Sequence, residues 1–237
     1  MSDKLLSVDD IRVGYGDGSE VLHGISLEVD PGEVVALLGR NGAGKTTTLR
    51  SIIGMQRPSS GSITFKGEDI TKEPMYETAR RGIGIVPEDR RVFGPITVEE
   101  HLSMAVQSSH RSASEEFERA FTRFPELERL RDRQAGNLSG GEQQMLAIAR
   151  SLIGKKELLL FDEPTEGLAP KIVSKVGETV SKLKENHTIL LVEQNYPMAR
   201  QIADRYYILD NGLIRSQGTI QELEEDEGLK EKYLGIS

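Results

Sequence analysis

The sequence predicts a layered α/β domain, and two observations carry this prediction. Apolar runs without alternation, each bounded by turn residues, are typical of parallel strands buried on both faces. Four such runs occur: VVALLG (34–39), GIGIVP (82–87), ELLLFDEP (157–164) and TILLVE (188–193). Helix-prone segments lie between them, including KTTTLRSIIG, closed by Gly54, and GEQQMLAIARSLIG, closed by Gly154. Strands and helices that alternate along the chain in this way favour the α/β class.

The remaining segments predict three further elements. LLSVDDIRVGYG and VLHGISLEVDPGE near the N-terminus alternate roughly in polarity, as antiparallel strands with one wet face do. The stretch from Glu99 to Arg133 is polar, charged and helix-prone, and we expect a helical insertion there. The tail QELEEDEGLKEKYLGIS begins acidic and ends apolar, which indicates a short docking helix.

Composition excludes several classes of function. The 237 residues are 37% hydrophobic and 29% charged, as in an ordinary soluble protein. The net charge of −8 argues against a sequence-independent nucleic-acid binder, which needs a basic surface. The chain has no cysteine, so disulfides, thiolate zinc sites and cysteine nucleophiles are excluded. No apolar run approaches the roughly 20 residues of a membrane span, and the N-terminus lacks a signal-peptide pattern. We therefore expect a cytoplasmic protein without direct membrane insertion, which reaches a membrane only through a partner.

The segment GRNGAGKT (39–46) fits the phosphate-loop pattern G-x-x-x-x-G-K-[ST] and directly follows a predicted buried strand. Its glycines let backbone N–H groups close around phosphate oxygens, Lys45 can reach the β- and γ-phosphates, and the Thr46 hydroxyl can bind Mg²⁺. The helix that begins near Lys45 adds the positive end of its dipole. The alternative is a chance match in a glycine-rich turn, which the strand–loop–helix context disfavours. The segment therefore predicts a nucleotide site.

The segment LLLFDEP delivers two carboxylates at the end of another predicted strand. Open α/β sheets bind ligands at the carboxyl ends of their strands. Asp162 suits a direct or indirect Mg²⁺ contact, and Glu163 suits orienting or deprotonating the attacking water. An ordinary strand-to-turn transition is the alternative, and the phosphate loop makes the catalytic interpretation the stronger one.

A second anion site is predicted at NLSGGEQQMLAIARSLI (137–153), where Ser139, Gly140 and Gly141 precede a helix. The simpler alternative is that Ser139 only caps the helix. That alternative explains how the helix begins but not why two glycines follow.

These motifs, in this order, resemble those of the ABC-type ATPases, with LSGGEQ as the signature segment, and the resemblance covers the whole chain. It implies a P-loop NTPase with a RecA-like parallel-sheet core (1–88 and 155–237), an N-terminal antiparallel β subdomain within it, and an inserted α-helical subdomain (89–154). It implies ATP and Mg²⁺ as ligands, and Tyr15 as the aromatic that stacks on adenine, although a core tyrosine is the alternative. The nucleotide residues that it implies are Tyr15, Gly39, Asn41, Gly42, Ala43, Gly44, Lys45, Thr46, Thr47, Ser139, Gly140 and Gly141.

The resemblance also implies a second ATPase subunit, identical or different, arranged head to tail. ATP then lies between the phosphate loop of one subunit and the signature segment of the other. It assigns catalysis to Glu163, Gln194 and Lys45, and the metal to Thr46, Glu88 and Asp162.

Two positions depart from the general family pattern. Glu88 stands where most members carry glutamine, and Gln194 stands where most carry histidine. The blocks VPE-x-RRVF, TVEE, DEPTEGLAP and VEQN, with YLG near the end, resemble the ATP-binding subunits of branched-chain amino-acid importers, in which this glutamate and glutamine are expected. Asp89 still differs from the glycine expected there. Gln194 can donate a neutral hydrogen bond to a γ-phosphate but cannot act as an acid, so we expect reduced but real hydrolysis.

By the same resemblance, transmembrane permease subunits dock near Arg90, Arg91 and Phe93, which places the protein peripherally on the inner face of the cell membrane. A solvated basic turn is the alternative. Three other functions stay open: a low-activity regulatory subunit, an ATPase of a related urea, amide or other amino-acid transporter, and a soluble ABC ATPase outside transport.

Overall fold

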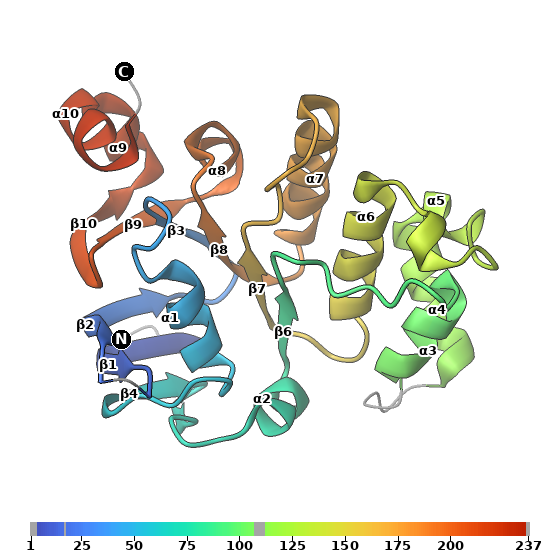
Figure 1. Ribbon diagram of the computed structural model, residues 1–237, viewed down its shortest axis with the longest axis horizontal. Helices are drawn as coiled ribbons and strands as arrows, with labels where there is room; N and C mark the ends of the chain where they lie inside the picture. The colour runs from blue at the N-terminus through green and yellow to red at the C-terminus, as the bar shows by residue number, and fades with distance from the viewer. Residues whose placement is uncertain (1–3, 17, 107–111, 236–237) are drawn as a thin grey trace.

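The computed structural model describes residues 4–16, 18–106 and 112–235, which form two sheets with helices around them (Figure 1). The smaller sheet is antiparallel. In spatial order its strands are β2 (Glu20–Val29), β1 (Leu6–Gly14), β4 (Ser60–Phe65) and β5 (Glu68–Asp69). The larger sheet is parallel except for its edge strand β10. Its order is β10 (Leu213–Thr219), β9 (Arg205–Asp210), β3 (Val34–Leu38), β8 (Thr188–Glu193), β7 (Leu158–Asp162) and β6 (Ile83–Val86).

The central strand β3 shows why the core runs are apolar without alternation. Val34, Ala36 and Leu38 belong to one buried cluster, and Val35 and Leu37 belong to another. The first cluster continues into helices, and the second continues into the antiparallel sheet and the first helix. Both faces of the larger sheet are therefore covered, so every position of β3 is buried.

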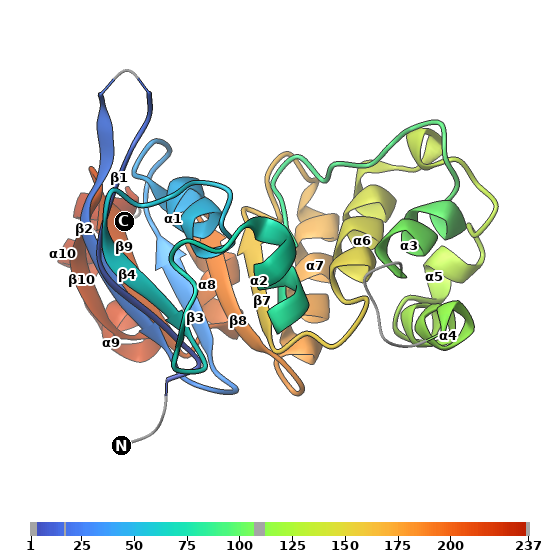
Figure 2. The ribbon, with the colours of Figure 1, turned by 90° about the horizontal axis from the view of Figure 1, so that it is seen from below.

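The helices cover the larger sheet and extend beyond it. They are α1 (Lys45–Ile52), α2 (Met75–Arg81), α3 (Val98–Val106), α4 (Ala113–Arg123), α5 (Pro125–Glu128), α6 (Gly140–Ser151), α7 (Pro170–Leu183), α8 (Tyr196–Ile202), α9 (Ile220–Glu225) and α10 (Glu227–Leu229), with the short turns η1 (Ala135–Asn137) and η2 (Lys230–Leu234). In both views α3, α4 and α5 lie at the end of the molecule opposite β1 and β2 (Figures 1 and 2). Within the described residues, every helix is too short or too polar to cross a bilayer.

The predicted α/β class is confirmed. The four apolar runs form the parallel strands β3, β6, β7 and β8, and the N-terminal segments form antiparallel strands. The stretch from Glu99 to Arg133 is helical where it is described, and its residues 107–111 lie outside the described part. The tail forms α9, α10 and η2, and its last two residues also lie outside. The division into core and helical subdomains at 88 and 155 stays a prediction.

Four strands were not predicted from the sequence: β4, β5, β9 and β10. A signal for the last two was present, because Asn211 and Gly212 separate them as a two-residue loop. Both residues have positive φ, 49° and 69°, and Asn-Gly with that geometry favours a tight β-hairpin.

Candidate functional site

A cleft of about 380 Å³ lies at the carboxyl ends of β3 and β7. The loop between β3 and α1, together with the first turn of α1, supplies six of its eleven lining residues. The acidic part comes from the segment after β7 and from Glu88 after β6. The lining residues are Tyr15, Val21, Asn41, Gly42, Gly44, Lys45, Thr46, Thr47, Glu88, Glu163 and Glu166. Sequence segments far apart along the chain therefore meet at the edge where parallel sheets bind ligands.

The loop from 39 to 44 needs glycine at two points for different reasons. A Cβ on Gly39 would lie 2.3 Å from the backbone oxygen of Leu209, so no side chain fits there. Gly44 has a φ of 111°, which other residues rarely adopt, and a Cβ on it would lie 2.6 Å from Leu22 Cδ2. α1 begins at Lys45, directly after this turn, and Lys45, Thr46 and Thr47 line the cleft. The N-terminus of a helix favours anions, so the predicted phosphate site adjoins the cleft.

Lys45 is buried and held by three acceptors. Its Nζ donates to the backbone oxygens of Gly39 (2.9 Å) and Arg40 (3.1 Å) and forms an ion pair with Glu163 Oε1 at 2.9 Å. Glu163 is itself buried and has a φ of 44°, a strained conformation for a residue with a side chain. The predicted phosphate-binding cation and the predicted water-positioning carboxylate are thus in direct contact.

Thr46 and Asp162 also meet, as a metal site requires. The Thr46 hydroxyl donates to Asp162 Oδ1 at 2.9 Å, which joins the first turn of α1 to the end of β7. Among the described residues, no group of three or more acidic, histidine or cysteine side chains could hold a metal. One carboxylate with one hydroxyl fits Mg²⁺, which keeps several waters and binds through substrate phosphates.

The carboxylates of this region crowd one another. Burial raises the pKa of Asp162 to about 6; the hydrogen bond from Thr46 opposes this, and the charges on Glu88 and Glu163 add to it. A hydrogen bond with Glu163 raises the pKa of Glu166 to about 7, with further contributions from burial and from the charge on Glu163. Such a concentration of negative charge favours a bound cation.

Tyr15 and Glu88 lie on the rim of the same cleft. The Tyr15 hydroxyl is within 3.2 Å of Thr47 Oγ1, and its side chain is 39% exposed. An aromatic ring at the mouth of the phosphate cleft is placed where a base could stack. Glu88 is exposed at the end of β6, close enough for its charge to act on Asp162.

The signature segment lies at the start of α6, outside the cleft. Ser139, Gly140 and Gly141 are not among the residues that line the cleft. Ser139 caps α6 through a reciprocal pair with Glu142: the Glu142 N–H donates to Ser139 Oγ (3.3 Å) and the Ser139 N–H donates to Glu142 Oε2 (2.7 Å). A Cβ on Gly141 would lie 2.9 Å from Ile172 Cγ2. Capping and packing against α7 therefore explain part of this pattern without a ligand.

Gln194 is exposed at the end of β8 and does not line the cleft. Its polar neighbours have structural partners. Buried Glu193 accepts from the Thr165 hydroxyl at 2.7 Å and from the Asn195 N–H at 3.1 Å. Asn195 caps α8 by accepting from the Met198 N–H at 3.2 Å. Gln194 is thus exposed, whereas Glu193 is buried and Asn195 is half-buried.

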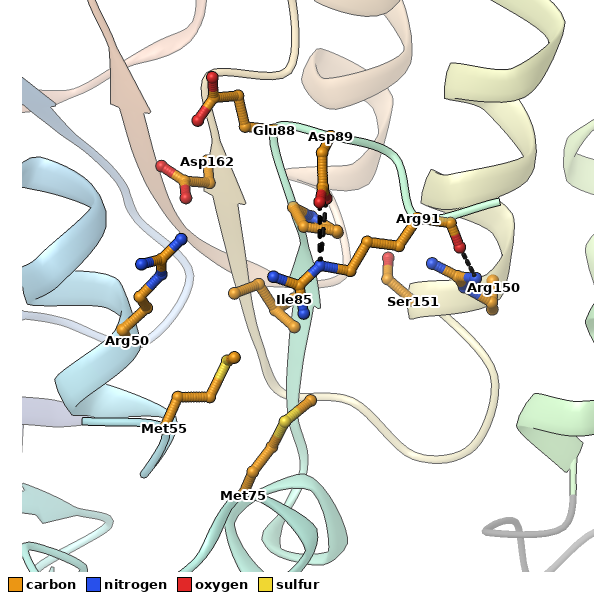
Figure 3. Close-up of a pocket in the computed structure, with 11 residues that line it drawn as sticks. Arg50, Met55, Met75, Ile85, Glu88, Asp89, Arg91, Arg150, Ser151 and Asp162 are labelled. Carbon is orange, nitrogen blue, oxygen red and sulfur yellow. Dashed lines mark hydrogen bonds and ion pairs between the residues drawn. The ribbon is translucent and has the colours of Figure 1, made fainter. Parts of the chain in front are cut away.

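A second cavity of about 350 Å³ lies on the other side of Glu88 (Figure 3). Arg50, Met55 and Met75 line one wall, and Asp89, Arg91 and Arg150 line the opposite one. Glu88 lines both cavities, so the nucleotide cleft and this groove adjoin each other at this residue.

The two cavities are also lined by residues that the sequence does not predict as site residues, among them Val21, Glu166 and Arg150. Val21 lines the cleft from β2, and Glu166 lines it from the loop after β7. Arg150 lies in the last turn of α6 and lines the second cavity. Glu166 lay within a motif assigned by resemblance, whereas no local pattern marks Val21 or Arg150.

A parallel sheet with a glycine loop at one strand end, a buried lysine, a Thr–Asp pair and an adjacent glutamate defines a P-loop nucleotide hydrolase. The family model for the ABC transporter ATP-binding region, described as "ABC transporter", matches residues 22–166. The chain belongs to this family, and it is an ABC-type ATPase that binds ATP.

Relatives match along almost the entire chain. The high-affinity branched-chain amino acid transport ATP-binding protein BraG of Pseudomonas aeruginosa is 42% identical, over 98% of this chain and 100% of its own length. The lipopolysaccharide export system ATP-binding protein LptB of Haemophilus influenzae is 33% identical, over 98% and 97%. Among solved structures, a nucleotide-free ATP-binding cassette from an ABC transporter has a TM-score of 0.84 at 27% identity and covers 99% of each chain.

Proposed function

We propose that this chain hydrolyses ATP to power an importer for branched-chain amino acids. The observation that supports hydrolysis most strongly is the contact of Lys45 with Glu163 beside the Thr46–Asp162 pair. The 42% identity to BraG supports this solute class over the others, including lipopolysaccharide.

In the proposed reaction the loop N–H groups and Lys45 bind the β- and γ-phosphates, and Tyr15 stacks on the base. Thr46, Asp162 and Glu88 would hold Mg²⁺, which neutralises phosphate charge when bound. Glu163 orients the attacking water and accepts its proton, while Gln194 donates to the γ-phosphate. Lys45 exchanges Glu163 for a phosphate oxygen when ATP binds, which frees the Glu163 carboxylate for the water.

The active form in this proposal is a head-to-tail pair of ATPase subunits. The signature residues Ser139, Gly140 and Gly141 lie outside the cleft of their own chain, as a contribution to the partner's ATP requires. Their backbone N–H groups at the start of α6 supply anion donors, and the Ser139 hydroxyl exchanges Glu142 for a phosphate oxygen.

Permease subunits dock at the groove beside Glu88 and hold the protein at the inner face of the membrane. Arg91 is exposed, and Phe93 is 56% exposed while it stacks on His101 with ring centroids 5.9 Å apart. Exposed Met55 and Met75 line the groove on the wall opposite Arg91 (Figure 3). A short helix with apolar and acidic side chains suits such a surface.

A strain that lacks this chain tests the proposal when it is complemented with the wild-type protein or with Glu163→Gln. We expect ATP-dependent leucine, isoleucine and valine uptake to return only with the wild type, and the uptake of radiolabelled leucine measures it. Equal leucine uptake in both complemented strains, or restored uptake of urea in place of leucine, contradicts the proposal.

A further inference from the structure

The segment between the two cavities, the 88–91 loop (residues Glu88, Asp89, Arg90 and Arg91), has an unfavourable backbone. Arg90 has a φ of 57° and Arg91 a φ of 45°. Two consecutive residues with side chains rarely adopt the left-handed region, because Cβ then approaches the backbone. Such a conformation persists only where the surrounding structure enforces it.

Arg150, in the last turn of α6, holds the loop in this conformation. Its Nη1 donates to the backbone oxygen of Arg91 at 2.8 Å (Figure 3), and its Nη2 donates to the backbone oxygen of Arg90 at 3.1 Å. One planar guanidinium thus binds the carbonyl groups of both left-handed residues. A lysine lacks this planar pair of separated donors, since its ammonium is a compact charge on a flexible stem.

The side chains of the loop have other partners. Arg91 Nε donates to Asp89 Oδ1 at 3.1 Å, and Arg90 Nη2 donates to the Glu166 backbone oxygen at 3.4 Å. A Cβ on Gly140 would lie 3.5 Å from Arg90 Nη1, so Arg90 also lies against the start of α6. The loop is therefore connected to both ends of α6 and to the segment after β7.

The conformation of this loop sets the position of Glu88. Glu88 is its first residue, directly after Pro87, and lines the nucleotide cleft as well as the groove. The Arg90 N–H donates to the Pro87 carbonyl oxygen at 3.2 Å, so the turn that contains Arg90 closes on the residue directly before Glu88.

We infer that Arg150 is a positioning residue that fixes the 88–91 loop so that Glu88 faces the metal side of the nucleotide cleft. The inference rests on the proposed role of Glu88 toward Mg²⁺. Arg150 lies in the last turn of the signature helix α6, so it also connects this helix to the loop that we expect the permease to contact.

The test compares purified wild type, Arg150→Lys, Glu88→Gln and the double variant. We expect Arg150→Lys to raise the Mg²⁺ concentration for half-maximal ATP hydrolysis by about tenfold, as the loss of a charge-assisted hydrogen bond predicts. The affinity for ATP in EDTA, measured by fluorescence titration, stays within about twofold, because Arg150 lines the second cavity and not the nucleotide cleft. The double variant is no worse than Glu88→Gln alone.

Hydrogen–deuterium exchange supplies a measurement that does not depend on activity. In Arg150→Lys the amides of 88–92 exchange faster, and those at the start of α6 do not. Arg123→Lys is the matched control, because Arg123 lies in the last turn of α4 and lines neither of the two cavities. It leaves both readouts at wild-type values.

Any one of three results overturns the inference. These are a wild-type Mg²⁺ dependence in Arg150→Lys, unchanged amide exchange at 88–92 in that variant, and additive effects of Arg150→Lys and Glu88→Gln. These results leave the proposed function intact when the wild type still hydrolyses ATP in a Glu163-dependent manner. Equal ATP hydrolysis by the wild type and by Glu163→Gln would instead contradict the proposed function.

Discussion

The backbone conformation and the electrostatic environment of Glu163 depend on contacts between segments that are distant in the sequence. The segment LLLFDEP predicts a carboxylate at a strand end, and Glu163 lies there. Its ion pair with Lys45, its φ of 44° and its hydrogen bond with Glu166 depend on segments that fold against one another. The residue's position could be predicted, but its electrostatic environment could not.

Gln194 offers a residue-scale prediction. Its neutral amide is the donor in the proposed γ-phosphate contact, and a histidine adds a charge-assisted component when protonated. We expect Gln194→His to raise ATP turnover by about three- to tenfold, with the larger gain below pH 6.5, where histidine is charged. Steady-state phosphate release at pH 6 and pH 8 measures the effect.

The control variant is Gln194→Glu. An ionised glutamate can only accept hydrogen bonds, so it cannot donate to the γ-phosphate, and we expect ATP turnover to fall. Unchanged turnover in Gln194→His at both pH values would show that residue 194 does not touch the reaction. The exposure of Gln194 beside the buried Glu193 makes either substitution compatible with the fold.

At the scale of the element, helix α6 carries two tasks at its two ends. Its first turn begins with the signature glycines, and its last turn contains Arg150. The sequence predicts the helix and its start, because Ser139 and Glu142 form a local capping pattern. The contacts of Arg150 with the 88–91 loop join residues about sixty positions apart, and no local pattern encodes them.

Helix α3 gives a prediction about pH. Burial lowers the pKa of His101, whose Nε2 lies 3.1 Å from both the N–H and the carbonyl oxygen of Phe93. The charges of Arg150 and Glu100 act on it in opposite directions. Because the folded pKa lies below the ordinary 6.5, the unfolded chain binds more protons as pH falls, so folding is destabilised by acid.

We therefore expect the free energy of unfolding of the wild type to fall, relative to His101→Gln, as pH decreases from about 7.5 to 5. Urea denaturation across this range measures the difference, and the effect of His187 cancels because both proteins retain it. A difference that stays constant with pH would contradict the buried, neutral state of His101.

At the scale of the whole molecule, one chain contains two predicted anion-binding regions that do not line the same cleft. The phosphate loop belongs to the cleft at the ends of β3 and β7, and the signature segment begins α6 outside that cleft. The sequence predicts both regions because each is a local strand–loop–helix or cap pattern. Their separation in the fold is what requires a second subunit in the proposed mechanism.

The central claim is that the Lys45–Glu163 site hydrolyses ATP with Glu163 positioning the water. Purified wild type and Glu163→Gln, compared by phosphate release in excess Mg²⁺ and ATP, test it most directly. We predict that turnover falls about a hundredfold or more in Glu163→Gln, the usual contribution of a positioned general base, while ATP binding persists. Equal residual turnover in the two proteins would contradict the claim.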